Sequence, residues 1–417
     1  MKILYLCPDL GIPVLGHKGA SVHVRELTSA LSQAGHQVIL AAQMLNKSPW
    51  EKPAELKVPI LQVRPSAATS STIAAFKNFN EGLAAENSFP GELRRILYNQ
   101  DLLEDLRRRF ENSPPDLVYE RASLYATAGV SLARLFNVPL VIELNAPLAV
   151  EQSAYRATGF GQLAAHAERW TLNQADAVLV VSSELKNHVL HLGVTPEKIH
   201  IVPNGVNPAL FRPAKADPIL RKRLQLNGGP ILGFVGGLRP WHGVEILPRL
   251  MERLSRRHDS LRLIVVGEGQ LRSSLMETFE SMNLSKRVTF TGALAHEEIP
   301  AVIRQFDVAL APYPKLDHNF YFSPLKLYEY MACGVPVAAA KAGQIAEVVS
   351  HGKTGLLHDP GDLNALVRDC EKLLSNPKLS ATLGRAAAAK VAREFTWARN
   401  AERIGVLAKQ LIRAKRT

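Results

Sequence analysis

The sequence predicts an α/β protein with two domains, each built around a doubly wound parallel sheet. The chain has 417 residues, more than a single hydrophobic core normally holds. Short apolar strands alternate with amphipathic helices in both halves, which is the pattern of parallel α/β folds. Between the two alternating regions lies a dense cluster of turn residues at 203–218, which begins Pro203, Asn204, Gly205. These observations predict one domain on each side of that cluster.

The first half opens with an apolar strand, followed by a glycine-containing loop at 15–20 and a helix at 22–34 that ends at Gly35. The interval 45–115 is less regular, and we interpret it as connecting and acceptor-side structure. The strands expected in this half cover residues 3–6, 38–42, 117–119, 140–143 and 177–181.

The second half repeats the same alternation and closes with a helical pattern at 398–414. A terminal helix of this kind can return to pack on the first domain. We therefore expect an N-terminal domain of residues 1–205 that also takes up residues 398–417, and a C-terminal domain of residues 206–397. The strands expected in the second half cover residues 231–235, 261–266, 288–290, 308–311 and 335–338.

The composition is that of a water-soluble globular protein, with 47% hydrophobic and 21% charged residues. No apolar run approaches the roughly 20 residues of a membrane span, and the first residues lack the pattern of a signal peptide. Cys7, Cys333 and Cys370 are widely spaced, which supports neither a disulfide framework nor a zinc site. We therefore expect a cytoplasmic protein without a metal.

The net charge of +12 is concentrated in the second half. Residues 1–203 hold 19 Lys and Arg against 19 Asp and Glu, so the whole excess lies in residues 204–417. A basic half suits an anionic ligand such as a nucleotide diphosphate, and charge alone leaves nucleic acid and anionic lipid open. The basic residues are scattered and no nucleic-acid-binding motif is present, so we expect no nucleic-acid partner.

The segment 321–337 carries the most specific local signals. Ser323 is a good N-cap, Pro324 suits the first helical position, and Gly334 can end the helix before a buried strand. Lys326 then lies in the first turn, where a cation is unfavourable for the helix unless it faces an anion. Glu329, on the same helical face, could accept hydrogen bonds from ribose hydroxyls. The alternative is a Lys–Glu pair on the surface.

The order of the motifs resembles the retaining glycosyltransferases called group 1, or family four. The second half is similar to their donor domain through residues 233–244, the Gly267–Gly269 turn, Phe290-Thr291-Gly292, the segment 323–337 and residues 352–357. The first half is similar through the loop at 16–19, residues 35–38 and residues 202–206. The resemblance covers essentially the whole chain.

The resemblance implies the fold called GT-B, in which two Rossmann-like domains face each other across a cleft. It also implies metal-independent transfer of a sugar, with retention, from a nucleoside-diphosphate sugar to an acceptor hydroxyl, without a cofactor. Arg239 matches a diphosphate-binding arginine of the family. His242 stands near the place of a family lysine, so Lys326 is expected to supply the second cation. Glu329 matches the ribose ligand, whereas Tyr321 replaces the first glutamate of the family motif.

These expectations make Arg239, Lys326 and Glu329 the candidate catalytic residues. The donor-binding candidates are Gly19, Gly237, His242, Gly267, Gly269, Ala293, Tyr321, Ser323 and Leu325. Glu143, Asn145 and Arg121 are candidates for contact with the sugar or the acceptor, and a buried structural role is equally open for Glu143 and Asn145. The acceptor is expected to be a saccharide, a lipid-linked molecule or a small molecule.

Two other functions remain open from the sequence. One is a nucleotide-sugar epimerase of the same architecture, and the other is a non-catalytic protein that binds nucleotide sugars or a membrane surface. A peripheral contact with the inner membrane face would use a basic helix around residues 96–110. A solvated helix, balanced by Asp101, Glu104 and Asp105, is the alternative. The basic residues of that helix are Arg94, Arg95, Arg107, Arg108 and Arg109.

Overall fold

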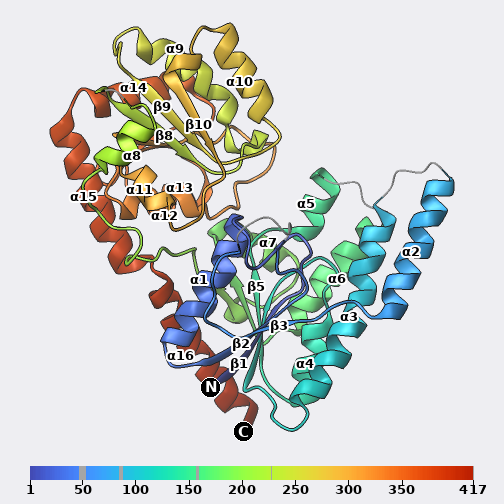
Figure 1. The fold of residues 1–417 in the computed structure, drawn as a ribbon. Coiled ribbons are helices and arrows are strands. Elements are labelled where there is room, and N and C mark those ends of the chain that lie inside the picture. The colour runs from blue at the N-terminus through green and yellow to red at the C-terminus, as the bar shows by residue number, and fades with distance from the viewer. Residues whose placement is uncertain (47–52, 84–87, 156–158, 227, 417) are drawn as a thin grey trace. The chain divides into compact units, whose positions relative to one another are not determined.

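The computed structural model describes residues 1–46, 53–83, 88–155, 159–226 and 228–416, and the chain divides into two compact units. Unit 1 consists of Met1–Pro203 together with Ala398–Thr417, and unit 2 of Asn204–Trp397. Each unit contains one parallel sheet (Figure 1).

The sheet of unit 1 has the strand order β3-β2-β1-β4-β5-β6-β7, and every neighbouring pair is parallel. The five strands predicted from the sequence are confirmed, and the three-residue strands β3 and β7 were not predicted. β1, β4, β5 and β6 are almost entirely buried, as expected for a parallel sheet that is covered on both faces. The strands are β1 (Lys2–Cys7), β2 (Gln37–Ala42), β3 (Ile60–Gln62), β4 (Leu117–Arg121), β5 (Leu140–Leu144), β6 (Ala177–Val180) and β7 (Ile199–Ile201).

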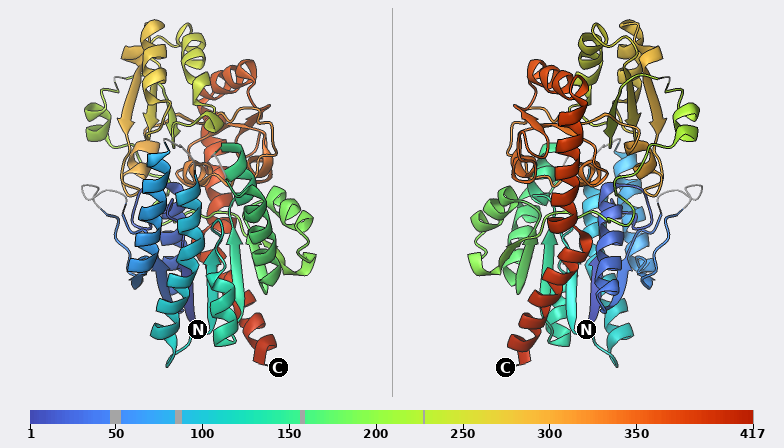
Figure 2. Two further views of the ribbon diagram at one scale, coloured as in Figure 1. Left: turned by 90° about the vertical axis from the view of Figure 1, so that its right-hand side faces the viewer. Right: turned by 90° about the vertical axis from the view of Figure 1, so that its left-hand side faces the viewer.

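Helices cover both faces of this sheet, with α1 and α16 on one side and α3 and α4 on the other (Figures 1 and 2). The C-terminal helix α16 is tied to unit 1 at both of its ends. Near its beginning, Asn400 donates to the Pro203 carbonyl oxygen at 2.7 Å, and near its end Lys415 pairs with Asp176. The helices of unit 1 are α1 (Gly19–Gln33), α2 (Ala67–Gly82), α3 (Phe89–Phe110), α4 (Ala128–Phe136), α5 (Leu148–Tyr155), α6 (Gly161–Gln174), α7 (Ser183–His191) and α16 (Trp397–Arg416), with a short 3₁₀ helix at Pro196–Lys198.

The helix considered as a basic membrane surface is α3, and its apolar side is not available to lipid. Leu102, Leu106 and Phe110 are buried inside unit 1, and Arg109 forms an ion pair with Asp105 at 2.6 Å. These contacts give no support to a membrane surface on α3. Among the residues that the structure describes, no helix is both long and apolar enough to cross a bilayer.

Unit 2 contains a second parallel sheet with the order β10-β9-β8-β11-β12-β13. The five predicted strands are confirmed, although the strand expected at 335–338 is β12 (Val337–Ala340). The short strand β13 (Leu356–His358) was not predicted. The remaining strands are β8 (Ile231–Val235), β9 (Arg262–Val266), β10 (Val288–Gly292) and β11 (Val308–Ala311).

One face of the unit 2 sheet packs against a core that contains Phe306, Tyr328 and Tyr330, and the other against a core that contains Leu250 and Phe279. The helices of unit 2 are α8 (Pro218–Arg223), α9 (Leu247–Ser255), α10 (Arg272–Ser281), α11 (Ile299–Ile303), α12 (Leu325–Ala332), α13 (Gly343–Val348), α14 (Leu363–Leu374) and α15 (Pro377–Glu394), with 3₁₀ helices at Pro240–His242, Val244–Ile246 and Ser285–Arg287.

The strand orders locate a topological switch point in each sheet. In unit 1 the chain leaves β1 toward β2 on one side, and β4 lies on the other side. In unit 2 the corresponding pair is β8 and β11. Loops that follow such a pair diverge, so ligands of doubly wound sheets bind at the carboxyl ends of these strands. The loops after β1 and β4 and the loops after β8 and β11 are therefore the places where a site is expected.

Glu120 is a buried carboxyl group on β4. Side chains alternate along a strand, so Glu120 faces one side, toward Gly129 of α4, while Tyr119 and Arg121 face the opposite side and bond to Glu143. Its side chain is 1% exposed, and burial raises the pKa of Glu120 to about 7, against a smaller lowering by the backbone of Gly129 in α4. A side chain at position 129 would overlap this carboxyl group.

Replacing Glu120 with Gln is expected to stabilise unit 1 above neutral pH. The folded pKa is about 7 and the ordinary value is 4.5, so the folded state loses stability as pH rises from 4.5 to 7. The loss amounts to at most about 3 kcal/mol. Urea unfolding should show a gain for Glu120→Gln that is larger at pH 8 than at pH 5, with the exposed Glu111→Gln as the control. An equal gain at both pH values would contradict this interpretation.

Candidate functional site

Three glycines allow close backbone packing at the carboxyl edge of the unit 2 sheet. Gly236, Gly267 and Gly292 follow or end β8, β9 and β10, and all three have positive φ, at 144°, 129° and 74°. Gly236 N–H donates to the Val266 carbonyl at 2.9 Å, and Gly267 N–H to the Gly292 carbonyl at 2.8 Å. A Cβ at Gly267 would overlap the Gly236 carbonyl oxygen. The glycines therefore let the backbone segments after β8, β9 and β10 pack directly against one another at this edge.

Lys326 lies beside this edge, in the first turn of α12. The helix begins at Leu325 with Pro324 as its N-cap, so the predicted cap at Ser323 is wrong by one residue. Pro324 has a ψ of 114°, which is extended, and therefore does not form the first helical residue. The Lys326 side chain is 8% exposed, and Nζ lies 4.1 Å from the ring centroid of Phe234. Among the described residues, Nζ has no hydrogen-bond partner. Burial lowers the pKa of Lys326 to about 7, although Glu329 opposes this shift.

Glu329 is also buried, with 7% of its surface exposed. Its Oε1 lies 2.9 Å from Nε2 of His296, and the His296 ring packs against Phe211 with 5.1 Å between the centroids. The alternative of a Lys–Glu pair on the surface is therefore wrong, because both side chains are inside unit 2. Sequence reasoning missed His296. The signal was its position, four residues after Gly292, in the loop that leaves β10 at the same edge.

Arg239 lies in the loop after β8 and is exposed. Its Nη1 donates to Oε1 of Gln270 at 2.8 Å, and its guanidinium lies 5.9 Å from the ring of Trp241. Gln270 belongs to the loop after β9, which is joined to the Arg239 loop by a bond from Leu238 N–H to the Glu268 carbonyl at 3.0 Å. The loop contacts hold the guanidinium near the carboxyl edge while leaving it accessible.

His242 is not a second cation of this site. Its Nδ1 lies 2.5 Å from the Gly237 carbonyl oxygen, and because a carbonyl oxygen only accepts, Nδ1 carries the proton. Burial, together with the charges of Lys326 and Arg239, lowers the pKa of His242 to about 3, although the bond to Gly237 opposes this shift. His242 is thus neutral near pH 7 and braces the loop after β8.

The remaining donor candidates of unit 2 lie in loops at the same carboxyl edge. Gly237 follows β8, and Gly269 follows β9, where a Cβ would overlap the Leu238 carbonyl oxygen. Ala293 is exposed in the loop after β10. Leu325 is the first residue of α12.

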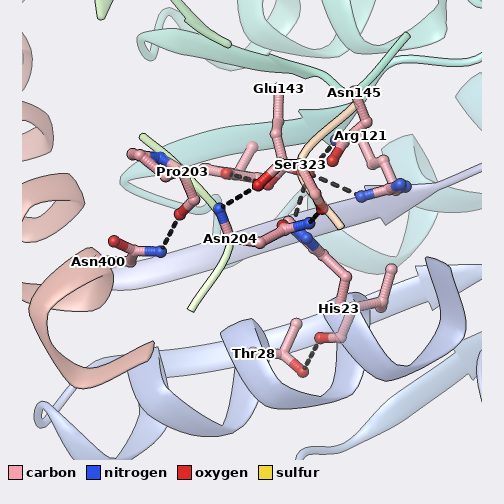
Figure 3. Close-up of polar contacts among 11 residues, drawn as sticks. His23, Thr28, Arg121, Glu143, Asn145, Pro203, Asn204, Ser323 and Asn400 are labelled. Carbon is pink, nitrogen blue, oxygen red and sulfur yellow. Dashed lines mark hydrogen bonds and ion pairs between the residues drawn. The ribbon is translucent and has the colours of Figure 1, made fainter. Parts of the chain in front are cut away.

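Tyr321 and Ser323 precede α12 and are both buried. Tyr321 stacks on His318, with 5.3 Å between the ring centroids. Ser323 Oγ accepts from Asn204 N–H at 3.1 Å, and the Ser323 carbonyl oxygen accepts from the Asn204 side chain at 2.5 Å (Figure 3). These bonds attach the segment before α12 to the first residues of unit 2.

In unit 1 the three acceptor candidates meet around one carboxylate, that of Glu143 (Figure 3). Glu143 accepts from Tyr119 Oη at 2.5 Å and from Arg121 Nη1 at 2.7 Å, and also from the Asn145 side chain. Nε2 of His23, from α1, lies 2.8 Å from its Oε1. Gly19 begins the same helix. The cluster lies at the carboxyl ends of β4 and β5.

These donors decide the protonation state of Glu143. Burial raises its pKa, but His23, Arg121 and Tyr119 outweigh burial and lower the pKa of Glu143 to about 2. A carboxylate with so low a pKa and four donors is a poor proton acceptor near pH 7. His23 and Tyr119 were missed by sequence reasoning. Tyr119 had a signal, since its side chain faces the same side of β4 as Arg121.

Within the described ranges no group of three or more His, Cys, Asp or Glu side chains is arranged to hold a metal ion. The three cysteines are free and buried.

Comparison with known proteins gives a consistent result. The model of the family described as glycosyl transferases group 1 matches residues 217–390, and that of glycosyltransferase family 4 matches residues 17–210. A 2-deoxystreptamine glucosyltransferase of Streptomyces kanamyceticus is 31% identical over 281 residues, covering 65% of this chain and 70% of that protein. A glycogen synthase of Mycobacterium tuberculosis is 25% identical over 401 residues, covering 95% and 92%.

Solved structures share the fold. Sucrose-phosphate synthase from Thermosynechococcus elongatus has a TM-score of 0.74 at 21% identity, with 99% of each chain covered. Anabaena HepE in complex with UDP-glucose has a TM-score of 0.73 at 20% identity, covering 99% of this chain and 100% of that chain.

Replacing Glu143 with Gln is expected to destabilise unit 1. The variant leaves Arg121 buried without its counter-charge, a change that typically costs about 3–5 kcal/mol. Because the folded pKa is lowered, the contribution of Glu143 is present above pH 4.5 and is lost as pH falls toward 2. Urea unfolding should therefore show a difference from the native protein that is about 1 kcal/mol smaller at pH 4 than at pH 7. A Glu143→Gln protein as stable as Glu111→Gln at pH 7 would refute this role.

Proposed function

The chain belongs to the group 1 glycosyltransferases, and from this membership and the site geometry we propose that it moves a sugar from a nucleoside-diphosphate sugar to an acceptor hydroxyl, with retention and without a metal ion. Its activity as a glycosyltransferase follows from the family. What we propose beyond the family is that the donor is a nucleoside-diphosphate sugar, that the configuration of the sugar is retained and that the acceptor group is a hydroxyl.

The observation that carries the proposal is the placement of Arg239, Lys326 and Glu329 at one carboxyl edge, where the strand order switches between β8 and β11. A buried ammonium with no hydrogen-bond partner among the described residues is a favourable position for a phosphate oxygen. An accessible guanidinium can bind a second phosphate in bidentate geometry. The Glu329 carboxylate accepts hydrogen bonds and so suits the hydroxyls of a ribose.

Retention agrees with the chemistry of these groups. When the glycosidic bond breaks, negative charge grows on the departing diphosphate, which then takes the proton of the acceptor hydroxyl on the same face of the sugar. This route needs no pair of catalytic carboxylates. It needs positive charge that is already oriented toward the leaving group, and Lys326 and Arg239 supply that charge in place of a metal ion.

The acceptor is proposed to bind mainly through unit 1, near the Glu143 cluster. Because Glu143 is saturated by donors, we assign it the role of holding Arg121 and Asn145 in place for polar contact with the sugar or acceptor. Assays with a saccharide, a lipid-linked molecule and a small molecule as acceptor would identify its chemical class.

The donor site is tested directly by thermal shift with UDP, GDP and ADP, because a ligand that binds only the folded state raises the unfolding temperature. UDP is the first nucleotide to test, since Anabaena HepE was solved with UDP-glucose. Incubation of the donor with and without candidate acceptors then separates transfer from epimerisation, which needs no acceptor. Absence of stabilisation by all three nucleotides would refute the donor site.

Substitution of the two cations is expected to slow turnover. Arg239→Ala and Lys326→Ala should each lower kcat by about 10²–10³-fold, because each removes an oriented charge that stabilises the leaving group. Glu329→Gln should mainly weaken donor binding. Steady-state kinetics with the donor concentration varied up to saturation give kcat for the two cation variants and KM for Glu329→Gln. Arg256→Ala and Lys353→Ala, both exposed in unit 2, serve as controls. Near-native kcat in Lys326→Ala would show that this lysine is not part of the clamp.

A further inference from the structure

Lys326 is a cation whose surroundings disfavour its charge. The side chain is 8% exposed, and its Nζ has no hydrogen-bond partner among the described residues. Its nearest ring neighbours are Phe234, at 4.1 Å from Nζ to the centroid, and Tyr313, at 5.4 Å. Ring faces attract a cation, but they replace only part of the hydration that burial removes.

In the part of the chain that the structure describes, the ionisable groups nearest Lys326 lie on α12 and in the loops after β8 and β11. Glu329, on α12 itself, favours the ammonium form, but its carboxylate is shared with His296 at 2.9 Å. In the loop after β8, His242 is neutral because burial lowers its pKa to about 3, and Arg239 carries a positive charge. Tyr313, after β11, stays neutral because burial raises its pKa. Burial outweighs the charge of Glu329 and lowers the pKa of Lys326 to about 7.

A diphosphate would reverse this balance, because its oxygens supply the hydrogen-bond acceptors and the negative charge that Nζ lacks. We propose that binding of the donor diphosphate is coupled to the uptake of one proton from solvent by Lys326. This inference rests on the proposed function, and it adds a means by which the pH of the surroundings regulates donor binding.

The sign of the effect follows from the two states. In the empty site Lys326 releases its proton as pH rises through about 7, and in the occupied site it keeps the proton to higher pH. Only the protonated form is competent to pair with the diphosphate. The apparent affinity should therefore fall by about tenfold for each pH unit above that range, as the competent fraction falls.

The test is isothermal titration calorimetry of the intact protein with UDP, GDP or ADP, whichever gives the largest thermal shift. At pH 8 the terminal phosphate is already ionised, since its second pKa is about 6. Titration in three buffers of different ionisation enthalpy then gives the number of protons taken up. We expect about 0.9 proton per nucleotide for the native protein, from an empty-site pKa of about 7. At pH 6 we expect close to none from Lys326.

Two variants identify the titrating group. Lys326→Arg keeps a positive charge that is not lost at pH 8, and Lys326→Met leaves no ionisable group beside Phe234. Both should bind without this proton uptake, Lys326→Met more weakly, and the exposed Lys353→Arg should behave as the native protein. Binding without uptake in the native protein, or equal uptake in both variants, would overturn the inference alone. Failure of all three nucleotides to bind would overturn the proposed donor site and the inference together.

Discussion

Taking a charged side chain out of water costs free energy, and the carboxyl edge of the unit 2 sheet is built around one such side chain, that of Lys326. Neighbouring residues accommodate it in distinct ways. Phe234 and Tyr313 present ring faces to the ammonium, and Gly236 leaves the space that the ammonium fills, because a Cβ there would lie against Nζ. His242 is kept neutral partly by the same charge. The loop after β8 and the first turn of α12 are therefore electrostatically coupled.

Glu143 in unit 1 is a buried charge whose oxygens are surrounded by hydrogen-bond donors from neighbouring residues. Four donors surround that carboxylate, and its pKa is lowered despite complete burial. Lys326 has no comparable set among the described residues, and its pKa is lowered in the direction that removes the charge. A satisfied buried ion stabilises local structure, whereas an unsatisfied one is poised to bind an ion of opposite sign. The contrast separates the structural role proposed for Glu143 from the ligand-binding role proposed for Lys326.

The parallel topology explains why residues from distant parts of the sequence meet at each site. All strands of a sheet end at the same edge, so the loops after β8, β9 and β10 and the beginning of α12 converge in unit 2. The glycines at the ends of β8, β9 and β10 permit backbone packing that side chains would prevent. The same rule brings β4, β5 and α1 together at Glu143. Both clusters therefore follow from the fact that the strands of a parallel sheet end at the same edge.

The sequence by itself determined the alternation of strands and helices, the basic second half and the segment that carries Lys326 and Glu329. These are properties of local pattern, because burial on both faces of a parallel strand requires a run of apolar residues and glycine is favoured where φ is positive. The short strands β3, β7 and β13 escaped prediction, since three residues carry too little pattern and are ordered by their neighbours. The apolar residues of α3 were visible, but which surface they packed against was not.

Only the tertiary structure decided the charge states of the sites. The distance between His296 and Glu329, and that between His23 and Glu143, depends on how strands pair across 33 and 120 positions of sequence. The burial that lowers the pKa of Lys326 and His242 likewise arises from residues of several elements. Desolvation and ion pairing act over a few ångströms in space, so no periodicity in the chain encodes them.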